Sequence, residues 1–338
     1  MKYNFLGNTG LKVSELCLGT MTFGGNGGIW ANIGDLGQQE VDEIIKHAVD
    51  AGINFIDTAN VYSQGLSEQL TGKAIRNLGL KRDNLVIATK VRGKMGDAPN
   101  EIGLSRKHIM QQVDESLQRL NVDYIDLYQI HGYDALTPIE DTIDTLNDIV
   151  KSGKVRYIGC SNITAWQLMK ALAYSTHHHL PKFVSLQAYY TIAGRDLERE
   201  LIPLLNDQKV GLMVWSPLAG GLLSGKYGRN KNPEDARRLS FDFPPVNKEK
   251  AFDIIDVMEP IAQSKNVSVA QIALAWLLHQ PAVSTVIIGA KKLHQLEDNL
   301  KAIDVQLTQD ELQKLDEVSK LTPEYPGWML VRQGADRK

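Results

Sequence analysis

The chain has 338 residues, of which 43% are hydrophobic and 23% charged. This composition is ordinary for a globular protein and excludes a disordered or collagen-like chain. With 37 basic against 40 acidic residues, the net charge of −3 offers no field that would hold a nucleic acid or an anionic membrane. We therefore expect neither as a partner, and the oligomeric state cannot be read from the sequence.

Cysteine usage and the N-terminal segment both favour a cytoplasmic location. The two cysteines, Cys17 and Cys160, each lie in an apolar stretch, which is typical of buried thiols in a reducing compartment. The first residues lack the apolar core of a signal peptide, and no run approaches the roughly 18 apolar residues of a membrane span.

In chain order, a short hairpin over Tyr3–Leu6 and Lys12–Val13 is expected first. Short β-rich apolar runs then alternate with longer amphipathic segments, which is typical of parallel strands joined by helical crossovers. The eight expected strands are Glu15–Leu18, Asn54–Ile56, Leu85–Thr89, Tyr124–Ile130, Tyr157–Cys160, Phe183–Leu186, Gly211–Val214 and Thr285–Ile288.

A helical pattern follows each strand, and Ser105 and Thr164 are expected N-caps. Pro138 is expected in the first helical position of its helix. The helical segments are Gln39–Ala51, Ser67–Leu78, Ser105–Leu120, Pro138–Lys151, Thr164–Ser175, Asp196–Gln208, Lys248–Gln280 in two pieces, and Leu293–Ala302. Eight strand and helix pairs predict an α/β fold, a (β/α)8 TIM barrel that forms a single domain over residues 1–338.

Two insertions interrupt this rhythm, the Gly-rich Phe23–Leu36 with Trp30 and the charged Lys226–Asn247. Both follow strands, so they belong to the carboxyl-terminal face, where such barrels keep their sites. After the barrel we expect a polar helix near Gln309–Ser319 and then an irregular tail around Trp328.

Titratable residues close the strands of the first half. Asp57, Lys90 and His131 end the second, third and fourth strands, and Tyr62 lies in the loop after Asp57. Reduction of a carbonyl needs a proton donor, and the Lys90 ammonium is expected to lower the pKa of Tyr62 for that role. Asp57 is the expected counter-ion of Lys90, and His131 is expected to orient the substrate oxygen.

Each of these residues alone has a simpler explanation. A buried Asp–Lys pair can tie strands together, a His at a strand end is usually satisfied by hydrogen bonds, and a loop Tyr usually packs. Four on successive strand ends are much less probable as a coincidence, so we favour a proton-transfer site. Trp30, Tyr62 and His131 are the expected substrate contacts.

The second half offers neutral hydrogen-bonding groups and Gly-rich main chain, which suit a cofactor. Asn162 and Gln187 can hold a carboxamide, and Lys291 or Lys292 can hold a 2′-phosphate at a helix start, although a solvated surface position is the alternative for the lysines. The expected cofactor residues are Thr20, Met21, Asp57, Ser161, Asn162, Gln187, Trp215, Ser216, Pro217, Leu218, Gly220, Lys226, Arg237, Gly289, Lys291, Gln295, Asp298 and Asn299.

Several familiar motifs are missing. No G-x-G-x-x-G follows a strand, so a dinucleotide here would not sit on a Rossmann fold. There is no Walker A loop, C-x-x-C pair or H-E-x-x-H motif, and the adjacent histidines 177–179 do not share a helix face. We therefore expect no metal.

The sequence resembles the aldo-keto reductase superfamily over nearly its whole length. The motifs that carry the resemblance are Gly52–Ala59 with Tyr62 and Ser67-Glu68, Gly159–Asn162, Gln187–Tyr189, Trp215–Ala219, and Gly289-Ala290 with Gln295, Asp298 and Asn299. The resemblance implies a TIM barrel that binds NADPH, with Tyr62 as general acid, Lys90 and Asp57 as its partners and His131 as the fourth member of a tetrad.

The later motifs look closer to the branch of bacterial general reductases and potassium-channel β-subunits than to the aldose reductase branch. A preference for NADPH over NADH then rests on Lys291, Lys292 and Arg237. The resulting hypothesis is an NADPH-dependent reductase of small aldehydes or ketones. Two alternatives stay open: the same site acting mainly as an alcohol or sugar dehydrogenase, and an NADPH-binding regulatory subunit with slow turnover.

Overall fold

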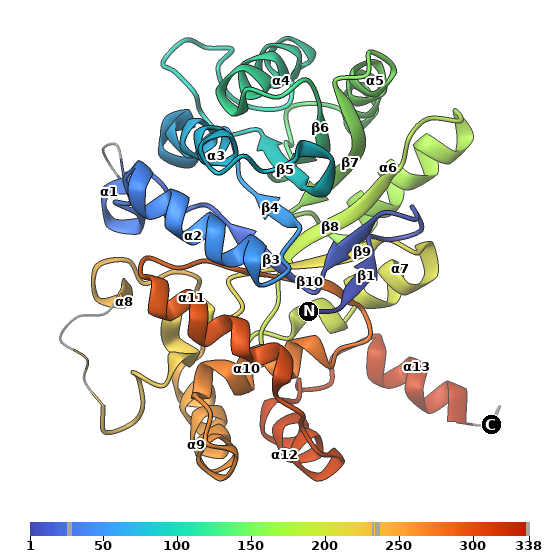
Figure 1. The fold of residues 1–338 in the computed structure, drawn as a ribbon. Helices are drawn as coiled ribbons and strands as arrows, with labels where there is room; N and C mark the ends of the chain where they lie inside the picture. The colour runs from blue at the N-terminus through green and yellow to red at the C-terminus, as the bar shows by residue number, and fades with distance from the viewer. Residues whose placement is uncertain (26–28, 232, 234–236, 336–338) are drawn as a thin grey trace.

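The computed structural model describes residues 1–25, 29–231, 233 and 237–335 (Figure 1). At its centre is a closed barrel of parallel strands, which are β3 (Leu16–Gly19), β4 (Phe55–Asp57), β5 (Val86–Val91), β6 (Ile125–Ile130), β7 (Val155–Ser161), β8 (Phe183–Tyr189), β9 (Gly211–Trp215) and β10 (Val283–Ile288). They follow one another in chain order, and β10 closes the ring between β9 and β3. The predicted TIM barrel is confirmed.

The expected hairpin forms from β1 (Tyr3–Phe5) and β2 (Lys12–Ser14) and covers the amino end of the barrel. Leu6 is fully buried and packs with barrel-interior side chains such as Phe55 and Met213. The turn of the hairpin packs closely against β8, because a methyl group on Gly7 would lie 2.4 Å from the carbonyl oxygen of Val184. Because this end is filled, the carboxyl end of the barrel is the one left for a site.

Helices surround the barrel (Figure 1). They are α2 (Gln38–Asp50), α3 (Leu66–Asn77), α4 (Arg106–Leu120), α5 (Ile139–Lys151), α6 (Ala165–His177), α7 (Leu201–Gln208), α9 (Lys248–Lys265), α10 (Val269–Leu278) and α11 (Leu293–Leu300), followed by α12 (Gln309–Ser319). Ser105 caps α4 by accepting from the His108 N–H at 3.3 Å, and Thr164 begins α6 with a capping box, as predicted. Pro138 stands one residue earlier than expected, at the N-cap of α5.

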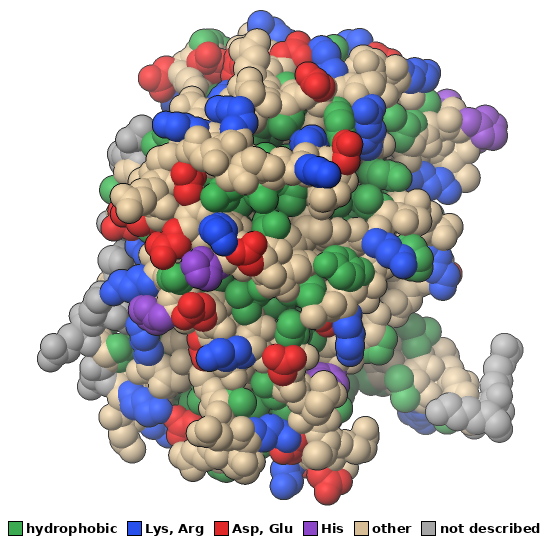
Figure 2. Space-filling view, viewed as in Figure 1, with side chains coloured by type: hydrophobic (Ala, Val, Ile, Leu, Met, Phe, Trp, Pro, Cys, Tyr) green, Lys and Arg blue, Asp and Glu red, His purple; other side chains and the backbone are tan. Residues whose placement is uncertain are grey.

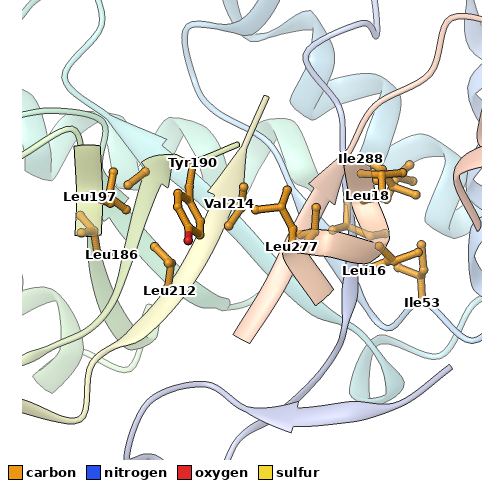
Figure 3. Close-up of a cluster of buried hydrophobic side chains, with 14 of the residues drawn as sticks. Leu16, Leu18, Ile53, Leu186, Tyr190, Leu197, Leu212, Val214, Leu277 and Ile288 are labelled. Carbon is orange, nitrogen blue, oxygen red and sulfur yellow. The ribbon is translucent and has the colours of Figure 1, made fainter. Parts of the chain in front are cut away.

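The main core lies between the strands and the helix ring. Figure 3 shows part of it, where Leu18 of β3, Val214 of β9 and Leu277 of α10 are among the packed side chains. Cys17 and Cys160 are both free and fully buried, as predicted, and burial raises the pKa of each thiol. The core is thus built from side chains of the barrel strands and from the apolar faces of the helices that pack on them.

Two local expectations need correction. The segment expected as one helix over Asp196–Gln208 is a 3-10 turn (Asp196–Glu198) followed by α7, because Pro203 lacks an N–H and is tolerated only in a first turn. The tail is not irregular: after Pro326 it forms α13 (Gly327–Gly334), since the run from Trp328 contains no helix breaker. This helix projects from the body (Figure 1), with Trp328, Leu330 and Val331 exposed.

The two insertions each contain a short helix, α1 (Trp30–Ile33) and α8 (Arg237–Ser240). Figure 2 shows acidic and basic side chains interspersed over one face of the molecule, in keeping with the nearly balanced charge. Within the residues described, no helix is both long enough and apolar enough to cross a membrane.

Candidate active site

A buried ion pair occupies the carboxyl end of the barrel. Asp57 and Lys90 end neighbouring strands, β4 and β5, and Lys90 Nζ lies 2.5 Å from Asp57 Oδ2 with both side chains almost fully buried. Lys90 Nζ also donates to the carbonyl oxygen of Thr58 at 2.8 Å. Burial alone would lower the pKa of Lys90, but the Asp57 carboxylate and the Tyr62 hydroxyl together outweigh it and the pKa is raised. Lys90 is therefore charged at neutral pH.

Two amides hold the second oxygen of Asp57. Gln129 Nε2 donates to Asp57 Oδ1 at 3.0 Å and Gln187 Nε2 does so at 2.9 Å. Gln187 was expected to hold a carboxamide, and here its amide group is bonded to Asp57. Gln129, fully buried on β6, was not among the expected site residues. Its signal in the sequence is an uncharged polar residue near the end of β6, two positions before His131.

Tyr62 lies directly beside this pair. Its hydroxyl is 3.4 Å from Lys90 Nζ, at the start of a 3-10 turn in which Ser63 and Gln64 have left-handed φ angles of 48° and 54°. Its ring makes edge contacts with Trp30 and His131, at centroid distances of 5.6 and 5.7 Å. The structure thus brings the four predicted catalytic residues and Trp30 together.

The expected lowering of the pKa of Tyr62 is wrong for the chain on its own. Burial raises this pKa, and the charge of Lys90 opposes the rise without cancelling it. The sequence shows that an ammonium follows on the next strand, but not how far the phenol is removed from water. Tyr62 is consequently protonated at neutral pH, which is the state that a proton donor requires.

His131 directly follows β6 on the other side of Tyr62, and its side chain is partly open to the mouth. Its carbonyl oxygen accepts from Asn162 Nδ2 at 3.0 Å. Desolvation, together with the charges of Lys90 and Arg92, lowers the pKa of the imidazole to about 3. His131 is therefore neutral, and it can donate one hydrogen bond while accepting another.

Uncharged groups line the ends of β7 to β9. Asn162, at a left-handed φ of 48°, accepts from Trp215 Nε1 at 3.2 Å. Beside it, the buried hydroxyl of Ser161 has no hydrogen-bond partner among the described residues. Buried polar groups are normally paired. An open hydroxyl next to an amide fits an uncharged carboxamide such as that of a nicotinamide.

A tight turn follows β9. Ser216 Oγ accepts from the Gly220 N–H at 3.0 Å. Gly220 has a φ of 65°, and a methyl group there would lie 2.3 Å from the carbonyl oxygen of Phe243. Pro217 is buried, whereas Leu218 is half-buried and Lys226 is exposed beyond the turn. The missing side chain at Gly220 thus lets this turn pack against the main chain at Phe243.

At the start of α11, Gln295 Oε1 accepts from the main-chain N–H groups of Lys291 and Lys292 at 3.0 and 3.2 Å. Asp298 accepts from Ser268 Oγ and Gln271 Nε2, both at 2.7 Å, so it ties α11 to α10. The remaining cofactor candidates vary in exposure. Asn299 and Thr20 are buried, Met21 is half-buried, Gly289 is exposed, and the side chain of Arg237 lies outside the part that is described.

Comparisons with known proteins show which family the chain belongs to. Residues 15–320 match the aldo/keto reductase family. The chain is similar to a probable voltage-gated potassium channel subunit beta of Arabidopsis thaliana, at 37% identity over 96% of this chain and 99% of the relative. It is also similar to a putative aryl-alcohol dehydrogenase of Schizosaccharomyces pombe (38%; 93% and 95%) and a versiconal hemiacetal acetate reductase of Aspergillus parasiticus (36%; 97% and 99%). The chain belongs to the aldo/keto reductase family.

Proposed function

We propose that the protein is a cytoplasmic, NADPH-dependent reductase of small aldehydes or ketones in which Tyr62 is the proton donor. Family membership and the relatives named as reductases and dehydrogenases support an oxidoreductase in general. The observation that carries the finer proposal is the buried cluster in which Lys90 Nζ lies 2.5 Å from Asp57 Oδ2 and 3.4 Å from the Tyr62 hydroxyl.

Each residue of the cluster has a separate role in the proposed reduction. When bound, the nicotinamide supplies a hydride to the carbonyl carbon. As negative charge develops on the carbonyl oxygen, Tyr62 transfers its phenolic proton to that oxygen, and neutral His131 hydrogen-bonds to the same atom. Lys90 then faces a phenolate, and each pKa unit by which it stabilises that form contributes about 1.4 kcal/mol. Asp57 keeps Lys90 charged throughout.

The residues at the ends of β7 to β9 and at the start of α11 support NADPH as the cofactor. Ser161 and Asn162 are proposed to hold the carboxamide and Trp215 to flank the ring. The main chain of the turn at Gly220 and Gly221 is proposed to contact the pyrophosphate, since a methyl group on Gly221 would meet no described atom within 4 Å. Lys291 and Lys292, near the amino end of α11, are proposed to favour the 2′-phosphate of NADPH over NADH. The two buried free thiols support a reducing compartment.

The test is loss of NADPH absorbance with a panel of aldehydes and ketones, run beside NADH and beside Tyr62→Phe. The variant should lose about 100-fold or more in turnover because it lacks the proton donor, while NADPH binding followed by Trp fluorescence stays intact. Turnover close to that of the unchanged protein in Tyr62→Phe would remove Tyr62 from the mechanism.

Two other functions have a specific observation behind them. Similarity to a probable potassium channel subunit beta favours an NADPH-binding regulatory subunit, which tight cofactor binding with negligible turnover and a stoichiometric partner in a pulldown would support. Similarity to a putative aryl-alcohol dehydrogenase favours the oxidative direction. Comparing NADP+ reduction by aryl alcohols with NADPH oxidation by the matching aldehydes decides between the directions.

A further inference from the structure

Arg92 has an unusual backbone conformation for its residue type. It follows β5 directly, two residues after Lys90, and its φ is 144°, within the range that favours glycine. Its carbonyl oxygen accepts from the Gly103 N–H at 2.9 Å, which fixes this turn. A non-glycine residue in such a conformation costs about 1–3 kcal/mol, and such residues cluster at functional sites. A glycine would adopt this backbone conformation without cost, so the reason for an arginine here lies in its side chain.

That side chain lies beside the strand end that carries His131. Arg92 Nε donates to the carbonyl oxygen of Tyr133 at 3.0 Å. Its stem runs along Gly132: a methyl group on Gly132 would lie 3.5 Å from Arg92 Cδ and 3.8 Å from the Asn162 Cβ. The guanidinium is thus held at the mouth next to His131, close enough that its charge contributes to the low pKa of that imidazole.

The charge of Arg92 is not neutralised within the described part of the chain. No described carboxylate lies within ion-pair distance, and only Nε has a hydrogen bond, so both terminal nitrogens are open on an exposed side chain. Asp134 makes no ion pair with Arg92. Burial would raise the pKa of Asp134, but the N–H groups of Leu104 and Leu136, from which it accepts, and then the charge of Arg92 lower it. Lys94, two residues further on, is paired with Asp97 at 2.7 Å.

We propose that Arg92 binds an anionic group on the carbonyl substrate, so that the preferred substrates are aldehydes or ketones that carry a carboxylate or a phosphate. This inference rests on the proposed reductase function. A guanidinium binds either anion through two parallel N–H bonds. His131, which is proposed to hydrogen-bond the carbonyl oxygen of the substrate, donates its main-chain N–H to the carbonyl oxygen of Val91, the residue before Arg92, at 2.8 Å. Neighbouring strands lie about 5 Å apart, so the site suits a compact substrate whose anion is a few bonds, or one aromatic ring, from its carbonyl.

The experiment compares matched substrates. One pair is 4-formylbenzoate and its methyl ester, and the other is glyceraldehyde 3-phosphate and glyceraldehyde, so the two pairs distinguish carboxylate from phosphate. We expect kcat/KM to be at least about 10-fold higher for the anionic member of one pair. In Arg92→Gly this ratio should fall to about 1, and in Arg92→Lys it should fall only partly, because the charge remains without the planar fork.

Two controls separate binding from folding. Arg92→Gly relieves the backbone conformation, so its thermal midpoint should be equal to or above that of the unchanged protein. Lys94→Leu removes a positive charge from the same loop, but one already paired, and should leave the substrate ratio unchanged. If Lys94→Leu lowered the ratio of kcat/KM as much as Arg92→Gly does, the preference would come from the overall positive charge of the loop. That result would overturn the specific role of Arg92.

Failure of this inference differs from failure of the proposed function. Reduction of neutral and anionic members at equal kcat/KM, or a preference that survives in Arg92→Gly, overturns the anion site and leaves the reductase standing. A second readout does not need turnover: calorimetric binding of 4-formylbenzoate and of glyceraldehyde 3-phosphate to Tyr62→Phe with NADPH. At least one should weaken about 10-fold or more when Arg92→Gly is added, and unchanged affinity for both contradicts the site.

Discussion

Lys90 and Asp57 form an ion pair whose members contact each other at 2.5 Å while both are withdrawn from water. Such a pair is stabilised by its short contact and by the hydrogen bonds that satisfy its remaining atoms. Here Gln129 and Gln187 donate to Asp57, and Lys90 donates to the Thr58 carbonyl oxygen. Loss of one member leaves the other charge buried without compensation. This makes the pair a determinant of stability as well as of chemistry.

Asp57→Asn should therefore lower the free energy of unfolding by about 3–5 kcal/mol, because Lys90 must then either hold an uncompensated charge in a dry site or give up its proton. Urea unfolding of the cofactor-free protein measures this. Asp50→Asn is the matched control, since the Lys46–Asp50 pair has the same 2.5 Å contact but both side chains are well exposed. Its unfolding midpoint should hardly move. Equal effects in the two variants would contradict the buried-charge explanation.

The rate of reduction should stay level from neutral to mildly alkaline pH. A general acid acts in its protonated form, and burial holds the pKa of Tyr62 above its ordinary value of about 10. Single-turnover oxidation of bound NADPH should therefore decline only as the pH passes that value. An inflection near pH 7 that disappears in Tyr62→Phe would mean that the phenol ionises much earlier than its burial allows.

His131 should not change its charge across the physiological range. Its pKa of about 3 keeps the ring neutral down to acidic pH, so protonation becomes appreciable only near that value. Heteronuclear NMR of the ring resonances, assigned by their absence in His131→Gln, should show no titration between pH 5 and 8. A chemical-shift midpoint between pH 6 and 7 would show that the ring is better solvated than its surroundings indicate.

Ser161→Ala should weaken NADPH binding by about 5-fold, which corresponds to one hydrogen bond of about 1 kcal/mol. The stability of the cofactor-free protein should not fall, because the hydroxyl that is removed has no partner in the described structure. Ser185→Ala removes another buried, unpartnered hydroxyl, from within β8, and should leave cofactor affinity unaltered. Equal affinities for all three proteins would take Ser161 out of the cofactor site.

The barrel and the convergence of Asp57, Lys90 and His131 could be predicted because parallel strands place their carboxyl ends on one face, whatever the details of packing. Gln129 could not, since only the strand register reveals that its amide reaches Asp57. The direction of the Tyr62 pKa depends on depth of burial, which has no local signature. Helix α13 is not predicted, because Pro326 and Gly327 directly before Trp328 favour an irregular segment.

The short helices α1 and α8 contact each other, although their insertions are about 200 residues apart in the sequence. Trp30 of α1 contacts Tyr62, and Arg238 of α8 donates to the carbonyl oxygens of Ala219 and Pro244, beside the turn that follows β9. Exchanging one insertion for that of a relative would remove the contact between α1 and α8 on which the other insertion packs. Loop grafting to change selectivity in this protein should therefore transplant both segments as a single unit.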